Sequence, residues 1–219
     1  MAKRALNGRQ RLIVGVTGAT GFIYAERTLR LLREIGVETH LVMSRAAELT
    51  RGYESSLSRD AVHALADHVY PIADVGASIA SGSFRTIGML VVPCSMRTVG
   101  EIASGVTSTL LTRAADVVLK ERLRLVLMVR ETPLHLIHLR NMTTVTEAGA
   151  VVFPPVPAFY AKPGSLEEMV DHSVSRALDQ FGLDTERIDA WRDTQIDRQA
   201  RVDNPIDDER MADHAEATA

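Results

Sequence analysis

A glycine-rich turn follows the first apolar run of this sequence and precedes a segment of helical periodicity. Its glycines are spaced three apart in Gly15-Val-Thr-Gly-Ala-Thr-Gly21. In a strand–loop–helix arrangement, backbone N–H groups and the positive end of the helix dipole point at an anion. A phosphate is the ligand that this chemistry favours, although such glycines also serve a tight turn and close helix packing alone.

The loop departs from the nicotinamide dinucleotide fingerprint. That fingerprint requires G-x-G-x-x-G and an acidic residue near the end of the second strand, which holds the ribose. Here the second expected strand ends at Met43-Ser44-Arg45. A hydroxyl beside a cation suits a phosphate oxygen better than a ribose diol, so NAD is not the expected ligand.

Several charged or polar residues could bind an anion further along the chain. Arg130-Glu131 ends an apolar strand, where a charged pair is a poor choice for packing and a good one for a site. Arg113 and Lys120 lie at helical spacing with Asp116, and spacing alone favours a solvated, ion-paired helix face. Tyr160 follows a proline-rich loop and could contact a ligand or act as an amphipathic plug.

The histidine and cysteine content offers little metal chemistry. His135 and His138 are three apart on an expected helix, a spacing compatible with metal ligation, but no third ligand accompanies them. We therefore expect them to be structural or interface residues, and expect no metal in the site. Cys94 is the only cysteine, which excludes an intramolecular disulfide and fits a reducing compartment. It is expected to pack as a small hydrophobe.

The elements that must position these residues alternate between short branched apolar runs and segments of helical period. This alternation predicts an α/β fold, with βαβ units around a parallel sheet and helices on both of its faces. Buried strands are expected at Leu12–Val16, Glu38–Met43, Val69–Ile72, Ile87–Val92, Leu125–Val129 and Val151–Phe153. The long helices are expected at Ile23–Ile35, Leu110–Arg122, Leu134–Ala148 and Leu166–Phe181.

Composition bounds the domain number and the partners. With 219 residues, 46% of them apolar, residues 1–191 are expected to form a single domain, and the polar residues 192–219 a solvated tail or arm. The net charge is −3 and the sequence has no dense run of Lys and Arg. A basic surface that would bind nucleic acid or an anionic membrane is therefore not expected. No apolar run approaches the roughly 20 residues that a membrane span needs, so we expect a cytoplasmic protein with a small-molecule partner.

Four further blocks accompany the glycine-rich loop. They are Val92-Pro-Cys-Ser-Met-Arg-Thr98, Thr112-Arg-Ala-Ala-Asp-Val-Val-Leu-Lys-Glu-Arg122, Leu127-Met-Val-Arg-Glu-Thr-Pro-Leu-His135 and Phe153-Pro-Pro-Val-Pro-Ala-Phe-Tyr160. Their order and spacing resemble the UbiX-type flavin prenyltransferases over roughly residues 11–191. The resemblance implies a three-layer flavodoxin-like or Rossmann-like fold, a homo-oligomer often described as a dodecamer, and production of prenylated FMN for a UbiD-type decarboxylase.

The resemblance also implies two groups of site residues. The FMN-binding positions match Gly18, Ala19, Thr20, Ser44, Ser95, Met96, Arg97, Thr98 and Arg130. The prenyl phosphate positions match Lys120, Arg130, Tyr160 and Arg176, with Glu54 and Arg113 near the site or reaching it across a subunit boundary. Such cations and a phenol suit a dianionic phosphate.

The implied reaction joins the dimethylallyl group of dimethylallyl phosphate to N5 and C6 of reduced FMN, without a metal. Lys120, Arg130 and Arg176 would stabilise the departing phosphate, and Trp191 would help to shelter an allylic cation. Glu131, tuned by burial, is the expected proton-transfer group, while Thr20, Lys120 and Glu54 complete the expected catalytic set.

Three departures from the family leave alternatives open. Thr20 stands where many relatives have Ser, Thr109 where Asn is common, and Phe22 where the residue is usually small, so Phe22 could narrow the pocket or shift the flavin. One alternative is a noncatalytic FMN carrier or decarboxylase accessory subunit. Another is a flavodoxin-like cysteine decarboxylase, although its P-x-M-N-x-x-M-W segment is missing here.

Overall fold

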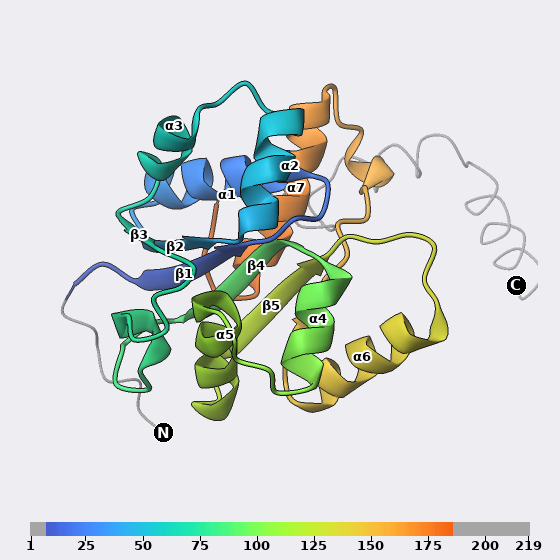
Figure 1. Cartoon of the computed structure of the whole chain (residues 1–219). Helices are drawn as coiled ribbons and strands as arrows, with labels where there is room; N and C mark the ends of the chain where they lie inside the picture. The colour runs from blue at the N-terminus through green and yellow to red at the C-terminus, as the bar shows by residue number, and fades with distance from the viewer. Residues whose placement is uncertain (1–7, 186–219) are drawn as a thin grey trace, which may run out of the picture. The chain divides into compact units, whose positions relative to one another are not determined.

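The computed structural model describes residues 8–185, which form a six-stranded, fully parallel sheet with helices on both faces (Figure 1). The strands are β1 (Arg11–Val16), β2 (Glu38–Met43), β3 (His68–Tyr70), β4 (Gly88–Cys94), β5 (Arg124–Val129) and β6 (Val151–Val152). The helices are α1 (Phe22–Glu34), α2 (Arg45–Glu54), α3 (Arg59–His63), α4 (Met96–Ala103), α5 (Leu110–Lys120), α6 (Leu136–Glu147) and α7 (Leu166–Asp179), with short 3₁₀ turns η1 (Ser78–Ala80) and η2 (Phe159–Ala161).

The expected fold class is confirmed. The strand order β3-β2-β1-β4-β5-β6 reverses direction between β1 and β4, which is the order of the doubly wound dinucleotide-binding fold. In such sheets, ligands bind outside the carboxyl ends of the strands at the point of reversal. A ligand site is therefore expected at the loops that follow β1 and β4.

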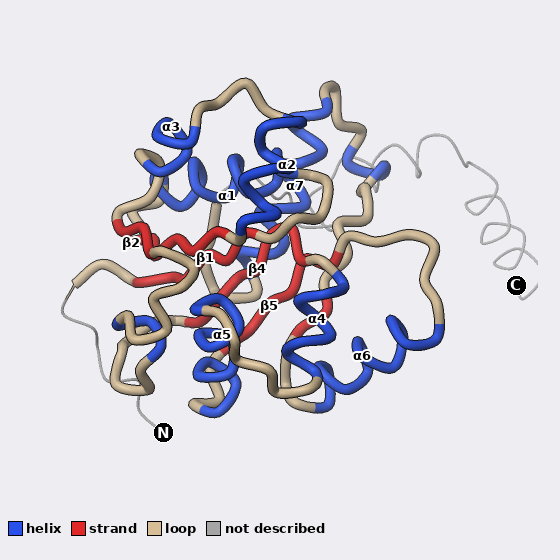
Figure 2. The backbone as a smooth tube through the Cα atoms, viewed as in Figure 1, coloured by secondary structure: helices blue, strands red, loops and turns tan. Residues whose placement is uncertain are grey.

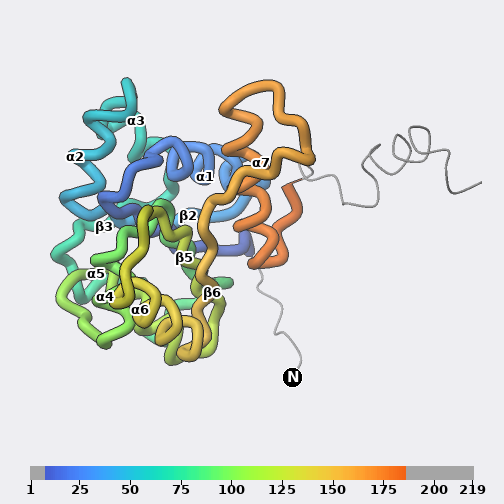
Figure 3. The backbone as a smooth tube through the Cα atoms, turned by 90° about the vertical axis from the view of Figure 1, so that its right-hand side faces the viewer, coloured from blue at the N-terminus to red at the C-terminus, as the bar shows by residue number. Residues whose placement is uncertain are grey.

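Two separate cores hold the helices to the sheet. Leu12, Val14 and Val16 of β1 face one core with α1, α2, α3 and α7, while Ile13 faces the other core with α4, α5 and α6. This alternation follows from the period of two along a strand. The tube views show the two helical layers and the loops that connect them to the sheet (Figures 2 and 3).

The expected strands and long helices are all present, with boundaries within a few residues, but two points were wrong. β3 and β6 are short edge strands rather than buried central ones, and Val69 of β3 is 39% exposed. The helices α2, α3 and α4 had not been located. In α2 and α3, only Ala47 and Val62 are buried, so neither helix carries a clear apolar stripe.

Two parts of the earlier expectations lie outside the described residues. Residues 8–185 belong to one compact unit. Trp191 and the expected tail at residues 192–219 lie beyond the described residues, so the boundary at residue 191 stays a prediction. No helix in residues 8–185 has the length and apolar character to span a bilayer.

An ion pair joins α1 to α7 beside the first core. Arg27 donates from Nε to Oδ1 of Asp171 at 2.6 Å and from Nη2 to Oδ2 at 2.5 Å. The side chains are only 24% and 11% exposed, and this bidentate contact raises the pKa of Arg27. Such a pair is worth more than an exposed one because water competes less for its atoms.

We predict that Asp171→Ala lowers the free energy of unfolding by about 1–3 kcal/mol, because Arg27 would lose its partner in a partly dry environment. Urea denaturation measures this loss. Asp179→Ala is the control, since Asp179 pairs with Arg176 where both side chains are about half exposed and should change stability by less than about 1 kcal/mol. Equal effects of the two substitutions would contradict the role given to the buried pair.

Candidate functional site

Thr17 links the loops that follow β1 and β4 at the point where the strand order reverses. Its hydroxyl donates to the carbonyl of Pro93 at 2.7 Å and accepts from the backbone N–H of Ser95 at 2.8 Å. The side chain is 2% exposed. Thr17 was missed in the sequence, although its place directly after β1 and beside Gly18 was a usable signal.

The first loop packs closely against α2. A Cβ on Gly18 would meet Ala46, and Gly21 has φ 102°, a backbone conformation that favours glycine. The amides of Gly21 and Phe22 at the start of α1 both donate to Glu54 at 2.8 Å. The carboxylate of Glu54 therefore occupies the N-terminus of α1 and takes two of the amides that a phosphate could use there, so a phosphate at that helix end stays a prediction.

Glu54 is held in its ionised form by these contacts. Burial opposes ionisation, but hydrogen bonds from Thr20 and the two amides, together with the charge of Arg130, outweigh it and lower the pKa of Glu54. Thr20 keeps the hydroxyl that this contact needs. Glu54 thus belongs to the site of its own chain and fixes the first loop.

The starts of α2 and α4 are the helix ends available for an anion. Ser44 accepts from the N–H of Ala47 at 3.0 Å and Ser95 accepts from Thr98 at 3.3 Å, so both serines are N-caps. Ser95 and Thr98 also share a hydrogen bond between their hydroxyls at 3.1 Å. Hydroxyls and first-turn amides of this kind can donate to phosphate oxygens.

Met96 and Arg97 contribute to that helix start through their backbone. The Met96 side chain is 7% exposed and packs into the second core, while Arg97 faces solvent and pairs with Glu101. Their expected binding role can therefore involve only their N–H groups in the first turn of α4.

A cavity of about 360 Å³ opens beside the first loop, at the carboxyl end of β5. It is lined by Thr20, Gly21, Tyr24, Val129, Arg130, Glu131, Thr132, Pro154 and Pro155. The first loop, the end of β5 and the proline-rich loop after β6 thus come together at this cavity. Tyr24 was missed: burial raises the pKa of its phenol while the charge of Arg130 lowers it, with a net rise.

Glu131 lies at this cavity but is exposed in the single chain. Its Oε1 accepts from the backbone N–H of Thr132 at 3.0 Å. The expectation that burial tunes this carboxyl is therefore wrong within one chain, because the loop after β5 projects beyond the sheet. Within residues 8–185, no element covers the Glu131 side chain.

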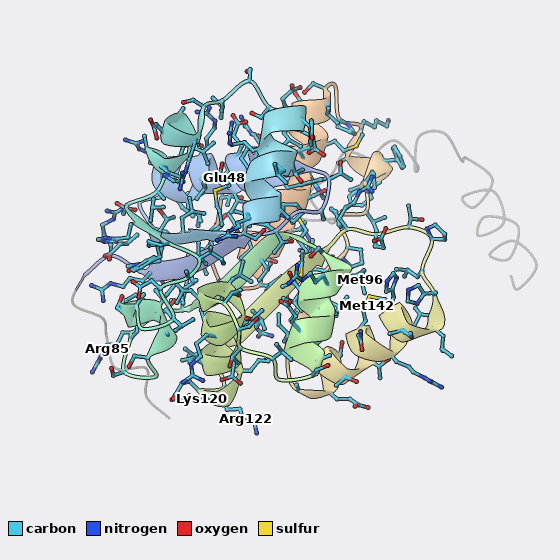
Figure 4. All side chains as sticks on the ribbon, in the orientation of Figure 1. Glu48, Arg85, Met96, Lys120, Arg122 and Met142 are labelled. Atoms are coloured by element: carbon cyan, nitrogen blue, oxygen red, sulfur yellow. The ribbon has the colours of Figure 1, made fainter. Side chains whose placement is uncertain are left out.

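Four residues expected to bind the prenyl phosphate do not line this cavity. Lys120 pairs with Glu121 beside Gly82, and Figure 4 shows it at the far end of α5 from Met96 at the start of α4. Arg113 pairs with Asp116, Arg176 pairs with Asp179, and Tyr160 packs edge-on against His172. None of the four residues lines the cavity together with Arg130 in the described part of the chain, so their role at the site stays a prediction.

The remaining candidates have structural roles. Burial raises the pKa of the Cys94 thiol, consistent with the packing role expected for it. His135 caps α6, and its ring centroid lies 3.6 Å from that of His138 with the planes tilted by 30°. Phe22 is 1% exposed in the first core, so it does not narrow the cavity, and Thr109 caps α5 in a capping box.

The chain matches a known protein family over most of its length. The family model described as Flavoprotein matches residues 2–178. The chain is 60% identical to flavin prenyltransferase UbiX of Neisseria meningitidis over 183 residues, which is 84% of this chain and 97% of the relative. It is 55% identical to the UbiX of Escherichia coli K12, covering 80% and 93% of the two chains.

Solved structures agree with these relatives. The crystal structure of AnUbiX (PadA1) in complex with FMN and dimethylallyl pyrophosphate is 56% identical, with a TM-score of 0.83 over 84% of this chain and 98% of the other. A dodecameric FMN-dependent UbiX-like decarboxylase of Escherichia coli O157:H7 is 50% identical, with a TM-score of 0.81 over 83% and 99%. The cysteine decarboxylase TvaF is only 16% identical and shares the fold alone.

We predict that Glu54→Gln changes how stability depends on pH. Folding lowers the pKa of Glu54 below its ordinary 4.5, so its ionised form stabilises the native state above that pH, and this contribution is lost as the pH falls through the folded-state pKa. The variant should be less stable than the parent at pH 7, and the difference should shrink below about pH 4.5.

Urea unfolding at pH 7 and at pH 4 or below measures this difference, with the exposed Glu147→Gln as the control. A stability difference between Glu54→Gln and the parent that stays constant across this range would show that the carboxylate is not held by the first loop.

Proposed function

The chain belongs to the UbiX family of flavin prenyltransferases, and from this we propose that it transfers a dimethylallyl group from dimethylallyl phosphate to reduced FMN. One observation carries the proposal most strongly. A chain 60% identical to a UbiX over 84% of its length places Thr20, Arg130 and Glu131 around one cavity. FMN is therefore the cofactor, and the enzyme is a transferase that needs no metal for this reaction.

The residues present fit FMN. The starts of α2 and α4 offer the hydroxyls of Ser44, Ser95 and Thr98, with the Met96 and Arg97 amides, for the phosphate group. The carboxylate in the first turn of α2, Glu48, is offset by contacts with Arg51 and Arg59. Gly18, Ala19 and Thr20 of the first loop would contact the flavin, and Arg130, which lines the cavity with Thr20, would add a cation.

When bound, the reduced flavin supplies the nucleophilic positions N5 and C6 that accept the prenyl group. Arg130 stabilises the departing phosphate by charge-assisted hydrogen bonds. Glu131 transfers the proton that ring closure requires, once a ligand or subunit covers it. Glu54 and Thr20 hold the first loop in position, and Tyr24 closes the wall of the cavity against water.

The prenyl phosphate site is completed by neighbouring subunits. Lys120, Arg113, Tyr160 and Arg176 are exposed or half-buried on the surface of one chain, away from its own cavity. The similar Escherichia coli protein is described as dodecameric. We therefore infer a homo-oligomer, dodecameric in the simplest case, in which these residues reach the Arg130 of another copy, with Trp191 a further candidate.

The product is prenylated FMN, which a UbiD-type decarboxylase uses, and both proteins work in the cytoplasm. The second candidate function is an FMN carrier that does not prenylate, which the exposure of Glu131 in the single chain keeps open. Cysteine decarboxylation has no support beyond the shared fold, since the cysteine decarboxylase TvaF is only 16% identical to this chain.

The direct test is to incubate the full chain anaerobically with reduced FMN and dimethylallyl phosphate, and to take the mass of the released flavin. A flavin heavier by one dimethylallyl unit supports the transferase. FMN returned unchanged, from protein that binds it tightly and is oligomeric by light scattering, would favour the carrier. Replacing the monophosphate with the diphosphate distinguishes the preferred donor.

We predict that Arg176→Ala raises the donor concentration needed for half-maximal turnover about ten- to hundredfold while FMN binding stays nearly unchanged. A lost charge-assisted hydrogen bond is worth roughly 1.5–3 kcal/mol, which corresponds to that range. Arg85→Ala, an exposed arginine outside the cavity (Figure 4), is the control. Loss of FMN binding in folded Arg176→Ala would contradict this division of the site.

Glu131→Gln should behave differently from Arg176→Ala. Both ligands should still bind, but turnover should fall because the amide cannot exchange the proton for ring closure, and a flavin alkylated only at N5 should accumulate. Mass and absorbance of the released flavin detect that species. Normal turnover by Glu131→Gln would remove the glutamate from the mechanism.

A further inference from the structure

A cluster of two histidines and a glutamate lies at the amino ends of β2 and β3. The Nε2 atoms of His40 and His68 lie 3.1 Å and 3.4 Å from Oε1 of Glu38. The two imidazole rings stack with centroids 4.6 Å apart and planes inclined by 17°. Among residues 8–185, this is the group of three histidine, cysteine or acidic side chains whose ligand atoms all come within 4.8 Å of one another.

The two printed separations from Glu38 are close to those around a metal ion, and the exposed ring of His68 has to turn out of the stack to aim its Nε2 lone pair at an ion that His40 also binds. Ligand atoms about 2.0–2.1 Å from a tetrahedral zinc ion lie roughly 3.3 Å from one another. Two imidazole nitrogens and one carboxylate oxygen are ligands that zinc accepts, with a water molecule in the fourth position. We propose that Glu38, His40 and His68 form a binding site for a divalent transition metal, with zinc as the best match.

A second layer of hydrogen bonds supports His40. Its Nδ1 lies 2.8 Å from the hydroxyl of Tyr70, which in turn lies 3.1 Å from the hydroxyl of Ser78. Metal-binding histidines usually bond their other ring nitrogen in this way, which fixes the ring and leaves the outer nitrogen for the metal.

Burial differs among the three ligands in a useful way. The side chain of His40 is 4% exposed and that of Glu38 is 18% exposed, while that of His68 is 52% exposed. His40 and Glu38 therefore provide a fixed base, and His68 provides the open side through which an ion and its water enter. No exposed acidic cluster is involved.

Arg11 competes with the ion for Glu38. Its Nε lies 3.1 Å from the same Oε1 atom, and its guanidinium also lies over the ring of Phe84, 5.6 Å from the centroid. The Arg11 side chain is 42% exposed, so it can turn toward solvent when an ion arrives. Its positive charge is expected to weaken, but not to prevent, metal binding.

The cluster is separate from the flavin site. Glu38 begins β2 and Ser44 follows its last residue, so the two sites lie at opposite ends of the strand. An ion here would join β2 to the three-residue edge strand β3 and stabilise the native chain by mass action. The proposal does not depend on the prenyl transfer reaction.

The test titrates Co²⁺ and Zn²⁺ into the full chain, prepared without a histidine tag. Co²⁺ should bind at one site per chain and give visible absorbance typical of a tetrahedral ion, which Zn²⁺ should displace. His68→Gln, an exposed change that leaves the core intact, should weaken binding at least tenfold. His63→Gln is the matched control, because His63 contacts a single carboxylate, Glu48, at 3.7 Å.

Arg11→Gln should have the opposite effect to His68→Gln. Removing the cation that competes for Glu38 should increase the affinity for Co²⁺ and Zn²⁺ several-fold. FMN binding should be the same in all these variants. The proposal is overturned if the parent binds no Co²⁺ or Zn²⁺ at micromolar concentrations. It is equally overturned if binding is unchanged by His68→Gln in protein with native circular dichroism.

Discussion

The hydrogen bonds of Thr17 across the boundary between β1 and β4 are the interaction on which the site depends. They connect the end of β1 to Pro93 and Ser95 at the end of β4, in a buried place where an unpaired polar group would cost free energy. Because the strand order reverses at this boundary, the helices that follow the two strands diverge to opposite faces. The backbone N–H of Thr17 also donates to the carbonyl of Pro93 at 3.3 Å, so the threonine hydroxyl adds two hydrogen bonds to a junction that the paired strands already begin.

The rest of the site is arranged around this link. Ser95 begins α4 next to Thr17, while Gly18 and Gly21 take the chain past α2 into α1. Glu54 returns from the far end of α2 to hold the amides of Gly21 and Phe22. The N-terminus of α1 is thereby neutralised by the chain itself, and the starts of α2 and α4 remain the favourable places for a phosphate.

Much of this could be predicted from the sequence, because local patterns carry it. The glycine-rich loop and the apolar strands gave the fold class and the edge of the sheet where the site lies. β3 and β6 were misjudged because an apolar run does not reveal whether a neighbour strand exists on both sides. α2 and α3 bury too few residues to show a stripe.

Contacts between distant residues could not be read in the same way. Glu54 is over thirty residues along the chain from the amides of Gly21 and Phe22 that it binds. A separation of this size in the sequence does not reveal a contact with the glycine-rich loop. The family resemblance named Lys120 and Arg176 as site residues. The sequence does not show that α5 and α7 place these two side chains away from the cavity of their own chain. The cluster of Glu38, His40 and His68 needs the parallel pairing of β2 with β3 and has no sequence motif.

The central claim is that the link made by Thr17 preorganises the phosphate site of the flavin, and FMN titration of Thr17→Val against Thr17→Ser tests it most directly. Valine removes both hydrogen bonds at nearly constant volume, at a cost of about 1–3 kcal/mol. FMN affinity should fall roughly five- to hundredfold in Thr17→Val, with native circular dichroism, and stay near the parent value in Thr17→Ser. Parent-like FMN affinity in folded Thr17→Val would contradict the claim.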